Sequence, residues 1–237
     1  MLELKNITKK YGKTTVLDDL TCEFDTGVNI IVGTNGCGKS TLLNIIGNLD
    51  TNFGGDVLFE RNFVSSIEYK MRTFYLPSDF YLPEFMTGKE YIDFIISLYP
   101  NSCENHLDDL IKLFKMDNSI DKMISNYSFG MKKKIQFIAS VCSNAKLYLF
   151  DELFSGLDFE TTIIIEEIIS HMSKNKTILL VSHDINTLKR FPQNIMIMSG
   201  GRLNKFSDDV DQIVKRISEM VIDEELLKSI GQDYECN

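Results

Sequence analysis

No apolar run in this sequence approaches the length of about 18 residues that a bilayer crossing requires. Its richest apolar stretches, LYLF and TILLV, are only as long as a strand and end at acidic or polar residues. The N-terminus, MLELKNITKK, shows no apolar signal segment. These absences predict that any role at a membrane depends on another chain.

The sequence also lacks paired cysteines and an excess of positive charge. Its 5 cysteines are odd in number and include no CxxC pair, which indicates a reducing cytosol. The 34 acidic residues outnumber the 25 basic ones and give a net charge of −9. Because this charge repels nucleic acid and anionic membrane surfaces, a free-standing DNA- or RNA-binding protein is disfavoured.

Apolar strands alternate with helices in the parts of the chain where the hydrophobic pattern is strongest. NIIVG, KLYLFDE (146–152) and TILLVSHD (177–184) lack polar alternation, which is typical of strands buried on both faces of a parallel sheet. The segment TTIIIEEIISHMSK between the last two has the pattern of a helix, so the order predicts a right-handed crossover and an α/β fold. Residues 1 to about 30 are expected to form short strands with turns.

The middle of the chain, about 78–145, has capped helical segments and no convincing strand. Thr87, three residues before Glu90, fits a capping box at the start of GKEYIDFIISLY. Two more helices are expected, the last from Ser128 to about Cys142. We therefore predict one domain, 1–206, with an inserted α-helical subdomain, followed by an acidic helical tail, 207–237.

The stretch GTNGCGKST carries the clearest chemistry. It matches the phosphate-binding pattern GxxxxGK[ST] and follows an apolar strand. A plain glycine-rich turn is the alternative, and the full pattern disfavours it. The loop alone leaves kinases, GTPases and many ATPases open. We expect nucleotide contacts from Gly33, Asn35, Gly36, Cys37, Gly38, Lys39, Ser40 and Thr41. A helix is expected from Lys39 to about Leu49.

Two carboxylates follow the apolar strand KLYLF. Asp151 ends this strand, where it can reach a phosphate-bound Mg²⁺ together with the Ser40 hydroxyl. Glu152 comes next and can polarise the water that attacks the γ-phosphate. A solvated strand end is the alternative.

YSFGMKKK, residues 127–134, resembles the signature loop of ATP-binding cassette (ABC) ATPases. SGLD, ending at Asp158, resembles their D-loop, and VSHD supplies a switch histidine at His183. Tyr11 matches the aromatic residue that stacks on adenine. These motifs occur in the family's order from about residue 2 to 206. The resemblance implies a P-loop NTPase core with a mostly parallel sheet, an N-terminal antiparallel β subdomain and an inserted α-helical subdomain.

The resemblance also implies a site shared between two copies. Each ATP is held between Lys39 of one protomer and Ser128 and Gly130 of its partner, with Asp158 beside it. Glu152 is the expected general base, His183 its γ-phosphate partner and Lys39 the charge clamp. The partner is a second copy or a paired ABC subunit.

Several residues depart from the family pattern. Ser78, with Asp79 as the alternative, stands where a glutamine usually helps to hold Mg²⁺. The signature has Phe129 and Met131 where glycine and glutamine are commonest, and Leu153 and Phe159 replace frequent prolines. The lysine run 132–134 is expected to form a solvated helix face, although an anion docked at the helix N-terminus is the alternative. We expect an active ATPase.

The loop PSDFYLPEFM contains the aromatic residues Phe80, Tyr81 and Phe85 between two prolines. Clustered aromatic residues in a surface loop indicate a docking site, and the resemblance implies that a separate membrane permease binds there. Tyr91 and Phe94 are expected instead in the core of the helical subdomain.

The function that follows is the ATP-hydrolysing subunit of a multi-chain ABC transporter, at the inner face of the cell membrane through its permease. The signature and the short C-terminal region favour a small exporter of a peptide, antibiotic or similar compound. One alternative is an ABC ATPase that acts as a mechanical or assembly factor on soluble partners. Another is a nucleotide-gated binding module whose hydrolytic residues are idle.

Overall fold

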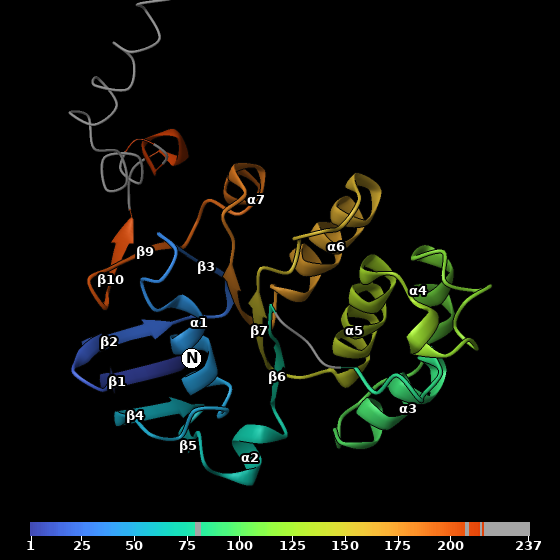
Figure 1. Cartoon of the computed structure of the whole chain (residues 1–237), viewed down its shortest axis with the longest axis horizontal. Helices are drawn as coiled ribbons and strands as arrows, with labels where there is room; N and C mark the ends of the chain where they lie inside the picture. The colour runs from blue at the N-terminus through green and yellow to red at the C-terminus, as the bar shows by residue number, and fades with distance from the viewer. Residues whose placement is uncertain (79–81, 207–208, 214, 216–237) are drawn as a thin grey trace, which may run out of the picture.

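The computed structural model describes residues 1–78, 82–206, 209–213 and 215. Two sheets lie side by side, and one group of helices lies on the side of the larger sheet away from the smaller one (Figure 1). In the described part of the chain, no helix is both long and apolar enough to span a bilayer.

The smaller sheet is antiparallel and has the strand order β2-β1-β4-β5. β1 (Leu2–Tyr11) and β2 (Thr14–Phe24) form the predicted N-terminal strands. The pattern near residues 54–63 did not reveal β4 (Gly54–Phe59) and β5 (Asn62–Phe63), which complete this sheet. β4 pairs with β1 across a long stretch of sequence, so no local turn signal marks the pairing.

The larger sheet has the strand order β10-β9-β3-β8-β7-β6. Its strands are β3 (Gly27–Gly33), β6 (Thr73–Leu76), β7 (Leu147–Asp151), β8 (Thr177–Val181), β9 (Ile195–Ser199) and β10 (Arg202–Phe206). All neighbours pair in parallel except β9 and β10, so the predicted α/β fold with a mostly parallel sheet is confirmed. Because β3, β7 and β8 are parallel neighbours, the loops after them meet at one edge.

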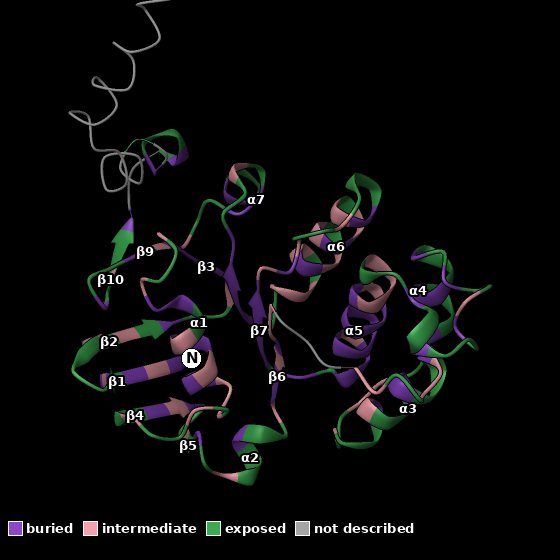
Figure 2. Ribbon diagram, viewed as in Figure 1, coloured by how far each residue is buried: buried purple, intermediate pink, exposed green. Residues whose placement is uncertain are grey.

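The two faces of the larger sheet pack against different helices, and the strands β7 and β8 are buried throughout (Figure 2). On one face, Ile31, Leu149 and Leu179 pack with α1 (Lys39–Ile46) and the smaller sheet. On the other face, their strand neighbours pack with the helices α5 (Phe129–Ser143), α6 (Phe159–Met172) and α7 (Ile185–Arg190). α1 and α5 therefore cover opposite faces of this sheet.

The helical segment contains α3 (Gly88–Ser97), α4 (Leu107–Leu113), the short helix η1 (Ile124–Asn126) and α5. Both hydrogen bonds of the predicted capping box between Thr87 and Glu90 are present. Tyr91 is buried as expected, whereas Phe94 is 47% exposed, so its assignment to the core was wrong. α1 also ends earlier than predicted, because Gly47 caps it and Asn48 has a positive φ of 58°. Away from this segment, α2 (Ile67–Lys70) precedes β6.

The predicted acidic tail lies outside the described residues except for 209–213 and 215. Within that short piece, Val210 and Ile213 are buried in the same hydrophobic core as α5, α6 and α7. Asp211 pairs with Lys189 of α7 at 2.8 Å.

Candidate functional site

The glycine-rich segment links β3 to α1 at the carboxyl end of the strand. Gly36 and Gly38 have φ angles of 78° and 109°, which residues with a side chain rarely adopt. A Cβ at Gly33 would lie 2.4 Å from the Met198 carbonyl oxygen, so a larger residue does not fit there. The other predicted contacts lie in the same loop or in the first turn of α1: Asn35, Cys37, Lys39, Ser40 and Thr41. A loop of this form before a helix N-terminus favours an anion.

The Lys39 side chain folds back along the loop. Its Nζ donates hydrogen bonds to the carbonyls of Gly33 and Thr34, each at 2.9 Å, and the residue is only 6% exposed. The ammonium is thus fixed beside the backbone that would surround a phosphate chain, where a charge clamp is needed.

Ser40 and Asp151, the predicted Mg²⁺ ligands, come together at the edge where β3 and β7 end. Burial raises the pKa of Asp151, and a hydrogen bond with the Ser40 side chain opposes this shift. A hydroxyl and a carboxylate are hard oxygen donors, which suit Mg²⁺ that also keeps water and phosphate ligands. The residues present therefore fit this metal.

Ser78 lies two residues beyond β6, at the same edge as Asp151, since Leu76 of β6 pairs with Phe150 of β7. Its role as a metal ligand stays a prediction. The alternative, Asp79, lies outside the described residues.

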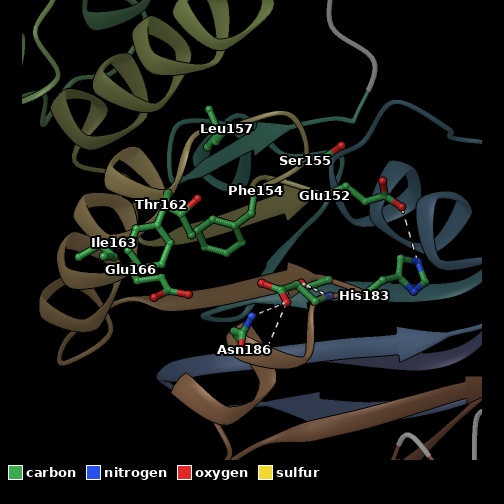
Figure 3. Close-up of a pocket in the computed structure, with 12 residues that line it drawn as sticks. Glu152, Phe154, Ser155, Leu157, Thr162, Ile163, Glu166, His183 and Asn186 are labelled. Carbon is green, nitrogen blue, oxygen red and sulfur yellow. Dashed lines mark hydrogen bonds and ion pairs between the residues drawn. The ribbon is translucent and has the colours of Figure 1, made fainter.

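Glu152 and His183 face each other across the ends of β7 and β8 (Figure 3). Glu152 Oε1 is 3.6 Å from His183 Nε2, and both side chains are about two-fifths exposed. Burial, with a smaller contribution from the charge of Lys39, lowers the pKa of His183 below its usual range. The imidazole is therefore neutral at pH 7, and one ring nitrogen can donate while the other accepts.

Tyr11 ends β1 and is 54% exposed, as an aromatic platform for a base requires. Its hydroxyl donates to Asp50 Oδ2 at 3.1 Å, and Lys9 Nζ lies 4.9 Å from the ring centroid. Lys9 is itself buried and paired with Asp50 at 2.6 Å. This support was not apparent from the sequence, because Lys9 and Asp50 are far apart along the chain.

The signature segment lies on the other side of the larger sheet from α1. Ser128 caps α5 by accepting a hydrogen bond from the Met131 N–H at 3.2 Å. Gly130 faces the loop after β7, since a Cβ there would lie 3.8 Å from the Gly156 carbonyl oxygen. Asp158 caps α6 by accepting from the Thr161 N–H at 2.8 Å. The start of α5, with Ser128 and Gly130, therefore lies close to the segment that leads into α6, with Asp158. The contacts of these three residues with nucleotide stay predictions.

The expectation that the lysine run forms a solvated face was wrong for Lys133. Lys132 pairs with Glu84 at 2.9 Å, and Lys134 lies 3.8 Å from Asp158. Lys133, however, is only 1% exposed, and burial lowers its pKa to about 8. Charge alone predicts a solvated lysine, so the sequence carried no signal for this burial.

A hollow of about 650 Å³ adjoins Glu152 and His183 (Figure 3). The sequence did not identify most of its lining, which comes from the loop after β7, from α6 and from the start of α7 and includes Phe154, Leu157, Thr162, Ile163, Glu166 and Asn186. Burial raises the pKa of Glu166. The helical pattern predicted α6 but did not show which of its faces turns toward the loop.

The family model for the ABC transporter matches residues 12–155 of this chain, from the turn after Tyr11 to the start of SGLD. The chain belongs to the ABC transporter family. This confirms the resemblance carried by its motifs, and the chain is an ATP-binding subunit with the ABC ATPase domain.

Relatives and solved structures of similar length agree. The chain is 27% identical to the ABC-type transporter ATP-binding protein EcsA of Bacillus subtilis (strain 168), over 86% of this chain and 85% of the relative. It is 28% identical to the polysialic acid transport ATP-binding protein KpsT of Escherichia coli, over 90% and 97%. A solved ATP-binding subunit of an ABC transporter superposes with a TM-score of 0.83 at 26% identity, covering 92% of this chain and 94% of that one.

Alkylation of Cys37 is expected to block ATP binding, and Mg·ATP added first is expected to protect the thiol. Cys37 Sγ is 3.9 Å from Lys39 Nζ and packs against Gly33, so an added group would occupy the phosphate loop. The measurement is mass-spectrometric labelling with and without Mg·ATP, followed by nucleotide binding. Cys103 serves as the internal control, because its labelling should not depend on nucleotide. Equal labelling of Cys37 in both conditions would contradict this prediction.

Proposed function

We propose that two copies of this chain, or this chain and a paired ABC subunit, close face to face around two Mg·ATP and drive a separate membrane permease by hydrolysing them. The observation that carries the proposal is the placement of α1 and α5 on opposite faces of one sheet. A nucleotide on the loop before α1 then needs the signature segment of another subunit to enclose its γ-phosphate.

The residues at the shared edge have complementary tasks in hydrolysis. Lys39 neutralises charge on the β- and γ-phosphates, and Tyr11 stacks on the adenine. Glu152 accepts a proton from the attacking water, while neutral His183 donates to the γ-phosphate. Ser40 and Asp151 would hold Mg²⁺, which supplies neutralisation of the developing phosphate charge. The partner's Ser128 and Gly130 would close the site.

The permease is proposed to dock at the loop that contains Phe85, which is 73% exposed. Phe80 and Tyr81 of the same predicted surface lie outside the described residues. Docked in this way, the chain would work at the inner face of the cell membrane. The rival function, a mechanical factor on soluble partners, predicts a different set of binding proteins.

Export of a peptide, antibiotic or similar compound is the proposed direction, and the signature YSFGMKKK supports it. Among the relatives, EcsA and KpsT are not named as importers, whereas the names of sulfonate, petrobactin, sulfate/thiosulfate and tungstate relatives at 25–26% identity specify import or uptake. Deletion of the chain should therefore sensitise cells to a peptide antibiotic. A loss of solute uptake without such sensitivity would favour import.

Purification from membranes in mild detergent tests the transport function. We expect a polytopic membrane protein to be retained and to stimulate ATP hydrolysis by this chain. Phe85→Ala should weaken both retention and stimulation, because it removes an exposed aromatic anchor. Phe63→Ala is the matched control, since Phe63 is a similarly exposed aromatic residue in β5 (51%). Retention of soluble partners alone would contradict the proposal and favour the rival.

A further inference from the structure

Lys133 of α5 reaches from the signature helix to the loop that carries Glu152. Its Nζ donates to the Glu152 carbonyl at 2.8 Å and to the Leu153 carbonyl at 3.1 Å. Burying an ammonium costs several kcal/mol unless hydrogen bonds compensate for the lost hydration. Here two main-chain carbonyls provide that compensation, both in the segment next to the reacting groups.

The backbone at Glu152 needs such support. Glu152 has a φ of 50°, in the left-handed region that residues with a side chain avoid. Its N–H donates to the Val181 carbonyl at 3.1 Å, and its own carbonyl also accepts from the Ser155 N–H at 3.2 Å. Strained conformations persist only where the surrounding contacts fix them. Lys133 supplies two of these contacts and connects them to another element.

Phe129, one turn earlier on α5, strengthens the same connection. Its ring centroid is 5.2 Å from Lys133 Nζ, a distance at which a cation and an aromatic ring attract. The ring also covers Gly156, where a Cβ would lie only 2.7 Å from a ring carbon. The first two turns of α5 therefore hold the loop from Glu152 to Gly156 by a charge, an aromatic ring and a close backbone approach.

We propose that Lys133 is a positioning residue that fixes the main chain of Glu152 and so aims its carboxylate at the attacking water of the same subunit. The inference rests on the proposed function of Glu152 as general base. It also implies a physical link, because the helix whose N-terminus would face the partner's ATP holds the catalytic carboxylate of its own subunit.

Lys133→Met tests this role in steady-state ATP hydrolysis. The substitution keeps an unbranched side chain but removes every donor. We expect kcat to fall by about 10- to 100-fold, the effect of a small misplacement of a reacting group, with KM for ATP unchanged. Lys133→Gln keeps a donor group, the amide NH₂, on a shorter and neutral side chain, and should recover part of kcat. Lys132→Met is the matched control, because Lys132 pairs with Glu84 at the surface. Equal kcat in wild type and Lys133→Met would overturn the proposal.

Mixed dimers separate positioning from a general loss of structure. One subunit carries Glu152→Gln, so only the other subunit's Glu152 can act. Lys133→Met, or Lys133→Gln if the first variant folds poorly, is then placed in one subunit or the other. We expect the rate to fall only when it shares a subunit with the intact Glu152.

Two outcomes of the mixed-dimer experiment would overturn the proposal. A loss only with the change in the opposite subunit would show that Lys133 supports the signature contact with nucleotide. Equal losses in both arrangements would show a general structural role. A wild-type protein without ATPase activity would instead overturn the proposed function, and the role of Lys133 with it.

Discussion

Replacing Glu152 by glutamine is expected to abolish turnover and to trap an ATP-bound dimer. Glutamine has almost the shape of glutamate, but its amide cannot accept a proton from water. Loss of a general base lowers kcat by about 10²- to 10⁴-fold. Lys39, Ser40 and Asp151 are unchanged, so ATP should still bind and, without hydrolysis, should keep two protomers together.

Phosphate release measures the loss of turnover in Glu152→Gln, and size-exclusion chromatography with Mg·ATP measures the dimer. Glu68→Gln is a suitable control, because this substitution removes the same charge from a different place, the first turn of α2. The control should hydrolyse ATP and should not accumulate as a trapped dimer. Sustained turnover by Glu152→Gln would refute the assignment of the base. Lost turnover without a trapped dimer would contradict the shared site.

The sequence predicted those parts of the site that follow one another along the chain. Gly33–Thr41 runs from the end of β3 through the loop to the start of α1 in consecutive residues. Its pattern can therefore be recognised without tertiary structure. The apolar runs of β7 and β8 likewise predicted buried parallel strands. The link between Glu152 and His183 came from the family resemblance, and the parallel pairing of β7 with β8 explains why the structure places them 3.6 Å apart.

The parts that the sequence did not predict depend on contacts between distant segments. Lys9 is buried where it hydrogen-bonds to Asp50, and Lys133 is buried where it hydrogen-bonds to the Glu152 carbonyl. Neither partner is close to its lysine in the sequence. The strand β4 pairs with the distant β1, and β5 in turn pairs with β4. Phe94 was assigned to the core because it is aromatic, yet its position on α3 turns it outward.

Phe137→Ala is expected to give the largest loss of stability among the changes considered. Phe137 of α5 is fully buried, with ring centroids 5.9 Å from Phe114 and 6.0 Å from Phe150 of β7. Truncating a buried phenylalanine removes apolar burial and leaves a cavity, at a cost of about 3–5 kcal/mol in the free energy of unfolding. Urea unfolding measures this loss, and Phe94→Ala is the control, with an expected change within about 0.5 kcal/mol because Phe94 is exposed.

The same packing connects stability to catalysis, since Phe137 joins the helix that carries Ser128 and Lys133 to the strand that ends at Asp151. If α5 positions the Glu152 loop, folded Phe137→Ala protein should lose kcat as well as stability. Its affinity for ATP should remain, because that affinity is set by the segment before α1 on the opposite face of the sheet. A fall in ATP affinity with kcat preserved would show that the two faces of the sheet are not independent in this way. A loss of stability no larger than that of Phe94→Ala would show that the core between α5 and β7 closes around the missing ring.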